Sequence, residues 1–330
     1  MARRRILSTL RYHEFREWTN RVDILDREGL SLPAFLRRLL AEARRYPTVI
    51  LTGTWRADQI AAMLIARMRR PPRVIMTDAS WRRGTDTVDR AARRVGVGAM
   101  RGEHTTFCVL SSWEQKIFPR KWGVPEDKVR FTPYCFTVPE GELDLPLRDD
   151  GGVFVGGGDP RHGRSRDPLR EYRPLIEAAT QVEGEITIAS NELDSVPMPP
   201  NVRAAPLSRE RFAELLREAT VVVVPIRGGI DRSAGQQTYL NAMALGKPVI
   251  VTDTPGVRDY IDDRETGLIV PPRDAEALAG AIRWVLDPAS RAEVDRMRDR
   301  ARDVTRARFS RHNYIAHILR VADDVARAGR

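Results

Sequence analysis

The feature that most constrains the fold is an alternation of short apolar runs with segments of helical spacing. In the C-terminal half, runs rich in β-branched residues predict buried strands at 153–156, 185–189, 220–225, 248–252 and 268–270. Between them apolar residues recur every three or four positions, and Ser208 and Asp274 are suited to cap helices that begin there. This alternation predicts βαβ units and a parallel sheet covered by helices on both faces.

The N-terminal half repeats the pattern less regularly. Strands are predicted at 48–51, 73–77, 106–110 and 129–132, and helices at 32–43 and 57–68. The segment 139–152, which is rich in Pro, Gly and acidic residues, is predicted to be a linker. The stretch 309–328 has the spacing of an amphipathic helix that must dock on another element. A chain of 330 residues therefore reads as an α/β protein of two domains.

The net charge of +10 comes almost entirely from Arg, which is interleaved with Asp and Glu along the chain. No nucleic-acid-binding motif accompanies it, so we expect no nucleic-acid partner. Attraction to phosphorylated ligands or to an anionic membrane fits the charge better. Cys108 and Cys135 lie in apolar, strand-like stretches and are expected to be buried thiols in a reducing compartment. Without an apolar run of about 18–20 residues, the expected location is the cytoplasm or the inner membrane face.

The first motif that carries chemistry is a strand that runs into three glycines, Gly156, Gly157 and Gly158. Glycine leaves no Cβ between the backbone and a ligand, and ligands of open α/β sheets bind beyond the carboxyl ends of strands. Arg164 and Arg170 follow within reach, and their guanidinium groups match phosphate geometry. A tight structural turn remains the alternative interpretation of the glycines.

The second motif is a glycine-rich loop that follows Pro225 and leads into a helix beginning near 234–236. The unpaired N–H groups and the dipole at such a helix start favour a diphosphate. Gln237 and Asn241 are four residues apart and share a helix face. The candidate donor-binding residues of this motif are Asp231, Ser233, Gly235, Gln236, Gln237, Thr238 and Asn241. An ordinary βαβ loop is the competing interpretation.

Residues 228–285 resemble the donor half of retaining GT-B glycosyltransferases of the family 4 type (glycosyl transferases group 1). The resemblance rests on the sequences at 242–250, 253–261 and 266–278. It implies a GT-B fold, in which two Rossmann-like doubly wound domains face a central cleft. The implied parts are an acceptor domain at 1–140, a donor domain at 145–308, and a helix at 309–330 that crosses back to the N-terminal domain.

The resemblance also implies roles for single residues. Arg170 stands at the family's basic position and would stabilise the leaving diphosphate, and Pro206 would lie beside the nucleobase. The family's two glutamates, eight residues apart, are replaced by Ser233 and Asn241 in this sequence. Asn241 retains hydrogen-bonding capacity for a ribose hydroxyl, and Asp231 is a candidate substitute for the missing carboxylate. The implied co-substrate is a nucleotide-sugar, UDP-linked, with no metal and no further cofactor.

Two candidates for catalysis lie in the N-terminal half. Asp78, with Trp81 close behind it, follows a predicted strand, and a carboxylate beside an aromatic ring suits binding or deprotonating a hydroxylated acceptor. A capping Asp with a packed Trp is the structural alternative. His104 lies just before another strand and is the second candidate, against an ordinary surface or core histidine.

The resulting hypothesis is a glycosyltransferase that moves a sugar from a UDP-sugar, with retention, to a small-molecule or lipid-linked hydroxylated acceptor. Two alternatives stay open. One is a catalytically weak GT-B partner or activator subunit, favoured by the missing glutamates, and the other is a nucleotide-sugar epimerase on the same fold.

Overall fold

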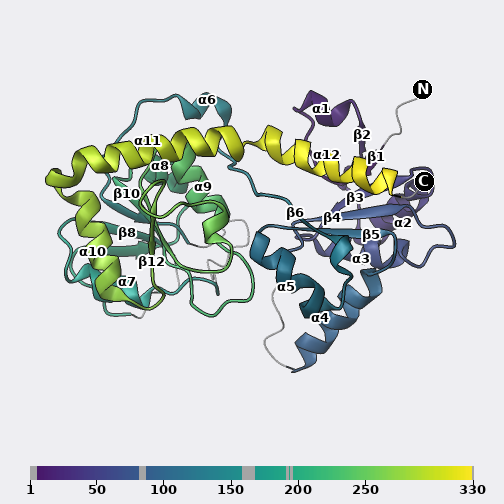
Figure 1. The fold of residues 1–330 in the computed structure, drawn as a ribbon, viewed down its shortest axis with the longest axis horizontal. Helices are drawn as coiled ribbons and strands as arrows, with labels where there is room; N and C mark the ends of the chain where they lie inside the picture. The colour runs from purple at the N-terminus through teal and green to yellow at the C-terminus, as the bar shows by residue number, and fades with distance from the viewer. Residues whose placement is uncertain (1–5, 82–86, 158–167, 191–192, 194–195, 329–330) are drawn as a thin grey trace. The chain divides into compact units, whose positions relative to one another are not determined.

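The structure is a computed structural model, and it describes residues 6–81, 87–157, 168–190, 193 and 196–328. The chain divides into two compact units, residues 1–133 with 312–330, and residues 134–311. Each unit is built on a parallel sheet of six strands with helices packed against it (Figure 1). The predicted α/β class is therefore confirmed.

The first unit has the strand order β2-β1-β3-β4-β5-β6. The strands are β1 (Ile6–Ser8), β2 (Val22–Ile24), β3 (Thr48–Thr52), β4 (Arg73–Thr77), β5 (Thr105–Val109) and β6 (Val129–Phe131). The helices are α1 (Arg16–Thr19), α2 (Leu32–Ala43), α3 (Arg56–Ile65), α4 (Thr87–Met100), α5 (Ser112–Trp122) and α12 (Arg311–Arg327). Ser31 and Ser111 cap α2 and α5, because each side chain accepts a hydrogen bond from the backbone N–H of the third residue of its helix.

The second unit has the strand order β12-β11-β10-β7-β8-β9. Its strands are β7 (Val153–Val155), β8 (Ile186–Ala189), β9 (Val202–Ala205), β10 (Val221–Val224), β11 (Val249–Thr252) and β12 (Leu268–Val270). Its helices are α6 (Glu140–Leu143), α7 (Arg173–Ala179), α8 (Arg209–Glu218), α9 (Gln236–Ala244), α10 (Ala275–Leu286) and α11 (Arg291–Arg308). Ser208 and Asp274 cap α8 and α10, as the sequence predicts.

Strand β10 shows why this sheet is parallel and buried on both faces. Val222 and Val224 belong to the core that includes α8 and α9, whereas Val221 and Val223 belong to the core that includes α7 and α10. Successive side chains of a strand point to opposite faces, so a run of four valines needs an apolar layer on each side.

The chain passes from the first unit to the second between Pro133 and Tyr134. Residues 139–152, which the composition predicts to be a linker, lie within the second unit. Cys108 and Cys135 are both buried, as expected. Across the described residues, none of the helices is both long and apolar enough to span a bilayer.

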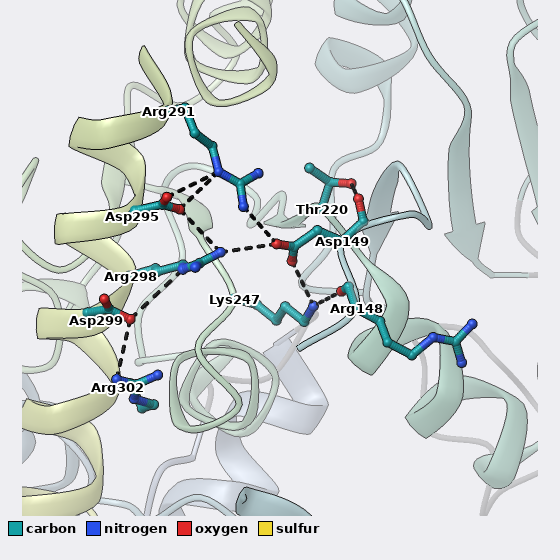
Figure 2. A network of polar contacts seen from close by, with 9 residues as sticks. All are labelled: Arg148, Asp149, Thr220, Lys247, Arg291, Asp295, Arg298, Asp299 and Arg302. Carbon is teal, nitrogen blue, oxygen red and sulfur yellow. Dashed lines mark hydrogen bonds and ion pairs between the residues drawn. The ribbon is translucent and has the colours of Figure 1, made fainter. Parts of the chain in front are cut away.

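A partly buried ion-pair network joins residues 148–149 to the rest of the second unit (Figure 2). Lys247, whose side chain has no exposed surface, donates to the Asp149 carboxylate at 3.1 Å and to the Arg148 carbonyl. Arg291 and Arg298 of α11 reach the other Asp149 oxygen at 3.1 and 3.0 Å. Burial alone would raise the pKa of Asp149, but the charges of Lys247 and Arg298 outweigh it and hold that pKa below its usual value. The network therefore joins the approach to β7, the end of α9 and α11.

Replacing Asp149 with Asn is expected to lower the free energy of unfolding by about 3–5 kcal/mol, because it leaves Lys247 buried without its carboxylate. The matched control is Asp150→Asn, since the Asp150 side chain is 71% exposed and its loss should cost less than about 1 kcal/mol. Urea unfolding at pH 7 measures both. Because the Asp149 pKa is depressed in the folded state, its contribution is lost as the pH falls through that pKa, so wild type and variant should converge in acid. Equal losses for the two variants would contradict a buried pair.

Candidate functional site

The N-terminal end of α9 lies directly against the carboxyl end of β7. A Cβ on Gly156 would lie 2.5 Å from the Thr238 methyl carbon, closer than real Cβ contacts allow. A Cβ on Gly157 would lie 1.9 Å from the Tyr172 hydroxyl oxygen. The glycines that end β7 are therefore required by close packing, and this packing sets the position of the helix start.

Arg170 lies beside that helix start. It forms an isolated antiparallel bridge with Ile226, the second residue after β10, and its side chain is buried, with 6% of the residue exposed. Its Nε donates to the Gly156 carbonyl at 3.1 Å. Its Nη1 lies 3.6 Å from the position that a Cβ on Gly235 would occupy. The structure thus brings together three predicted site residues that are far apart in the sequence.

The first turn of α9 offers backbone donors. Gly235 occupies the N-cap with φ of +82° and supplies no side chain to cap the helix. Gln236 is buried, with 6% of the residue exposed. Its side-chain nitrogen, Nε2, has no hydrogen-bond partner within the part of the chain that the structure describes. An uncapped helix start beside a guanidinium group attracts an anion with several oxygen atoms, such as a diphosphate.

The remaining predicted donor residues are placed as follows. Ser233 is buried, Asp231 is half-buried, and both precede the helix start by a few residues. Pro206 is exposed directly after the edge strand β9. Gly158 and Arg164 lie outside the described residues.

Asn241 and Gln237 share a face of α9, as their spacing predicts, and both contact Thr137. The Asn241 carbonyl oxygen accepts the Thr137 N–H at 2.7 Å, and its amide donates to the Thr137 hydroxyl at 3.1 Å. Gln237 donates to the same hydroxyl at 3.2 Å. Asn241 therefore anchors the segment before α6, a role that the sequence analysis missed because residues 137 and 241 are distant in the chain. The assignment of Asn241 to a ribose hydroxyl stays a prediction.

Substituting Asn241 with Leu should lower the free energy of unfolding by roughly 1–2 kcal/mol, because two hydrogen bonds to Thr137 are lost. The matched variant Thr137→Val removes the hydroxyl from the same contact and leaves α9 intact. If Asn241 also holds ribose, calorimetric affinity for a nucleotide should fall about tenfold in Asn241→Leu only. Equal nucleotide affinity in both variants would leave Asn241 a purely structural role.

In the first unit, Asp78 directly follows β4 at the carboxyl edge of the sheet. It has φ of +50°, an unusual value for a residue other than glycine. Its carboxylate accepts a hydrogen bond from the Tyr314 hydroxyl of α12 at 2.7 Å and a longer one from Thr52 at 3.4 Å. Burial raises the pKa of Asp78. A backbone held in this region and a carboxylate with a raised pKa are both features of proton-transferring residues.

The two remaining N-terminal candidates are Trp81 and His104, and the structure places them in different parts of the first unit. Trp81 is a core residue that packs edge-on against Phe107, and its indole N–H donates to the Gly53 carbonyl at 2.9 Å. Trp81 therefore packs against the core, as the structural alternative predicts, and it also lines a cavity of the same unit. His104 is exposed and precedes β5, so it lies at the amino edge of the parallel sheet, opposite Asp78.

Asp58 is a buried carboxylate that sequence reasoning missed. It lies in the first turn of α3, and one oxygen accepts the Thr52 N–H at 2.9 Å and a hydrogen bond from Thr9. Burial raises the pKa of Asp58 from 3.8 to about 6. It ties the carboxyl ends of β1 and β3 together, next to the edge that carries Asp78.

Because the folded pKa of Asp58 is raised, its contribution to stability is complete below pH 3.8 and is lost as the pH rises through about 6. Wild type should therefore lose roughly 3 kcal/mol relative to Asp58→Asn between pH 4 and pH 7. Urea unfolding at four pH values measures the difference. The control is Asp127→Asn, because the Asp127 side chain is 71% exposed. The free energy of unfolding of this variant should change with pH in parallel with that of wild type. A constant gap between wild type and Asp58→Asn would exclude titration of this group.

Two units, each with a parallel six-stranded sheet, define an α/β protein of two domains. Residues 162–288, which lie in the second unit, are similar to the family model described as glycosyl transferases group 1. The D-inositol 3-phosphate glycosyltransferase of Acidothermus cellulolyticus is 34% identical over 144 residues, which are 44% of this chain and 27% of that protein. The enzyme of the same name from Mycobacteroides abscessus is 28% identical over 165 residues, or 46% of this chain and 35% of that protein. The chain thus spans about a third of these curated relatives.

Solved structures extend the likeness over both units. The sucrose-phosphate synthase of Thermosynechococcus elongatus has a TM-score of 0.66 at 21% identity and covers 92% of this chain and 81% of its own. HepE of Anabaena, solved in complex with UDP, has a TM-score of 0.66 at 14% identity and covers 92% of this chain and 86% of its own. These likenesses confirm the predicted GT-B fold.

Proposed function

We propose that this chain is a glycosyltransferase that moves a sugar from a UDP-linked donor, with retention and without metal or other cofactor, to a hydroxylated acceptor. The match to the group 1 family over residues 162–288 supports the reaction class. UDP is proposed as the carrier because a relative in fold, HepE of Anabaena, was solved with it. We expect the chain to act in the cytoplasm, at the inner membrane face if its acceptor is lipid-linked.

The observation that carries the proposal is the placement of Arg170 beside the uncapped start of α9. A buried guanidinium group and the backbone N–H groups of the first turn of α9 would both act on the oxygens of a diphosphate. Charge builds up on that group as the bond to the sugar breaks. Donors already fixed in a desolvated site stabilise the developing charge without reorganising, which is the largest single contribution in many enzymes.

Asp78 is proposed to receive the proton of the acceptor hydroxyl. A carboxylate with a raised pKa is a stronger base than an ordinary surface carboxylate, and its hydrogen bond from Tyr314 holds it in one orientation. His104 stays a prediction with less support, since it lies at the opposite edge of the sheet.

The partner-subunit alternative is kept because of one observation. Asn241, which replaces the second of the family's glutamates, is hydrogen-bonded to Thr137. Ser233, which replaces the first, is buried. A subunit of this kind would bind no donor. The epimerase alternative has no observation of its own in its favour.

The test is the replacement of Arg170 by Ala and by Lys. Arg170→Ala should lower turnover roughly 100-fold or more, because one preorganised charge-stabilising group is lost, and Arg170→Lys should retain part of the rate. The control is Arg173→Ala, three residues away, whose side chain is 88% exposed and pairs with Glu177. Melting temperatures of all variants show whether loss of the Arg170–Gly156 bond has disturbed the fold.

Calorimetry with UDP, GDP, ADP and dTDP decides between enzyme and partner subunit. We expect UDP to bind wild type most tightly and Arg170→Ala to weaken that binding more than Arg173→Ala does. Affinity for every nucleotide no better than for inorganic phosphate would refute the donor site and favour the partner-subunit alternative.

A further inference from the structure

The first unit contains a cavity of about 510 Å³ that none of the roles above uses. It lies between α3 and α4, at the carboxyl edge of the sheet where Trp81 follows β4. Its volume is within the range of about 300–1,000 Å³ that small-molecule sites occupy. All of its described lining residues belong to this unit.

Two facing helix stripes form the walls. The α3 residues of the wall recur at the spacing of a single helix face and are Arg56, Gln59, Ile60 and Met63. The α4 residues do the same and are Asp89, Ala92, Arg93, Gly96, Val97 and Met100. Trp81 and Trp122 complete the lining. Side chains three and four apart lie on one face, so the two helices turn these stripes toward the same space.

The lining is divided into an apolar part and a cationic end. Ile60, Met63, Val97 and the two tryptophans present carbon surface, which favours an alkyl or aryl group. Arg93 is paired with Asp89 at 2.8 Å. Arg56, at the first position of α3, is exposed and makes no ion pair within the described residues. The charge left over at the cavity is therefore positive.

We propose that this cavity binds the apolar part of an amphipathic acceptor, with an anionic group of that acceptor at Arg56. The inference rests on the proposed function, because it names the chemical class of that reaction's second substrate. Binding itself requires only the cavity. Burial of each further methylene of an alkyl chain is favourable, so affinity should increase with chain length.

The helix α4 supplies a matched pair of steric probes. Gly96 lines the cavity, and a Cβ built on it would meet no atom within 4 Å. Gly98 lies on the same helix, also has open space at its Cβ position, and is absent from the cavity lining. Replacing either with Met should strengthen the helix by a similar amount, because Met has a higher helix propensity than Gly. Only Gly96→Met places a side chain in the cavity.

The experiment titrates ethyl, butyl and octyl phosphate, each as a monomer, against the full chain and follows tryptophan fluorescence. Octyl phosphate should bind at least tenfold more tightly than ethyl phosphate, and Gly96→Met should weaken octyl phosphate at least tenfold while Gly98→Met leaves it unchanged. Arg56→Gln should weaken the binding of octyl phosphate and leave the binding of octyl glucoside unchanged. The comparison separates the contribution of the phosphate charge from that of the alkyl chain.

Equal effects of the two glycine variants, or no gain with chain length, would overturn the proposal. UDP calorimetry on the same variants keeps the two hypotheses apart. Loss of octyl phosphate binding with normal UDP binding would refute the cavity alone, and octyl phosphate binding without any nucleotide binding would refute the proposed function alone.

Discussion

The candidate donor site depends on one steric constraint, the contact between Gly156 and Thr238. Any side chain at residue 156 would push α9 away from β7. The same displacement would move Gly235 away from Arg170, because Arg170 is held by the Gly156 carbonyl. A single missing Cβ therefore controls the separation between the guanidinium group and the helix start. Position is what gives such groups their catalytic value, since a site displaced by an ångström loses much of its electrostatic effect.

Two buried basic side chains among the described residues of the second unit, Lys247 and Arg170, have different surroundings. Lys247 donates to the Arg148 carbonyl and pairs with the Asp149 carboxylate, so its charge stabilises the fold. Arg170 donates to a backbone carbonyl and lies beside uncapped N–H groups, an arrangement in which the groups all favour negative charge. Burial and charge alone would not distinguish these residues. The contacts of Lys247 with Asp149 and Arg148 explain why a Lys within the most recognisable motif is structural.

Local signals in the sequence predicted most of the strands and the glycine-rich loop before α9, but not β1, β2 or β9. The run of valines at β10, the caps at Ser208 and Asp274, and the glycine before α9 each act over a few residues, so a pattern can reveal them. The failures concern contacts between distant residues. Trp81 packs on aromatic rings from β5 and α5, and Asn241 bonds to a residue 104 positions away. The pKa of Asp58 likewise follows from tertiary burial, which no spacing discloses.

The replaced glutamates bear on how the proposed reaction would proceed. Ser233 is neutral and buried, so it would contribute no carboxylate charge beside the donor sugar. Positive charge developing on the sugar would then meet less compensation than in a site with a glutamate. The reaction must in that case depend more strongly on the departure of the diphosphate, which Arg170 and the α9 start are placed to assist. Such a site would be most effective when Arg170 and the start of α9 fully enclose the diphosphate of the donor. Water would otherwise weaken the electrostatic interactions of these groups with the diphosphate.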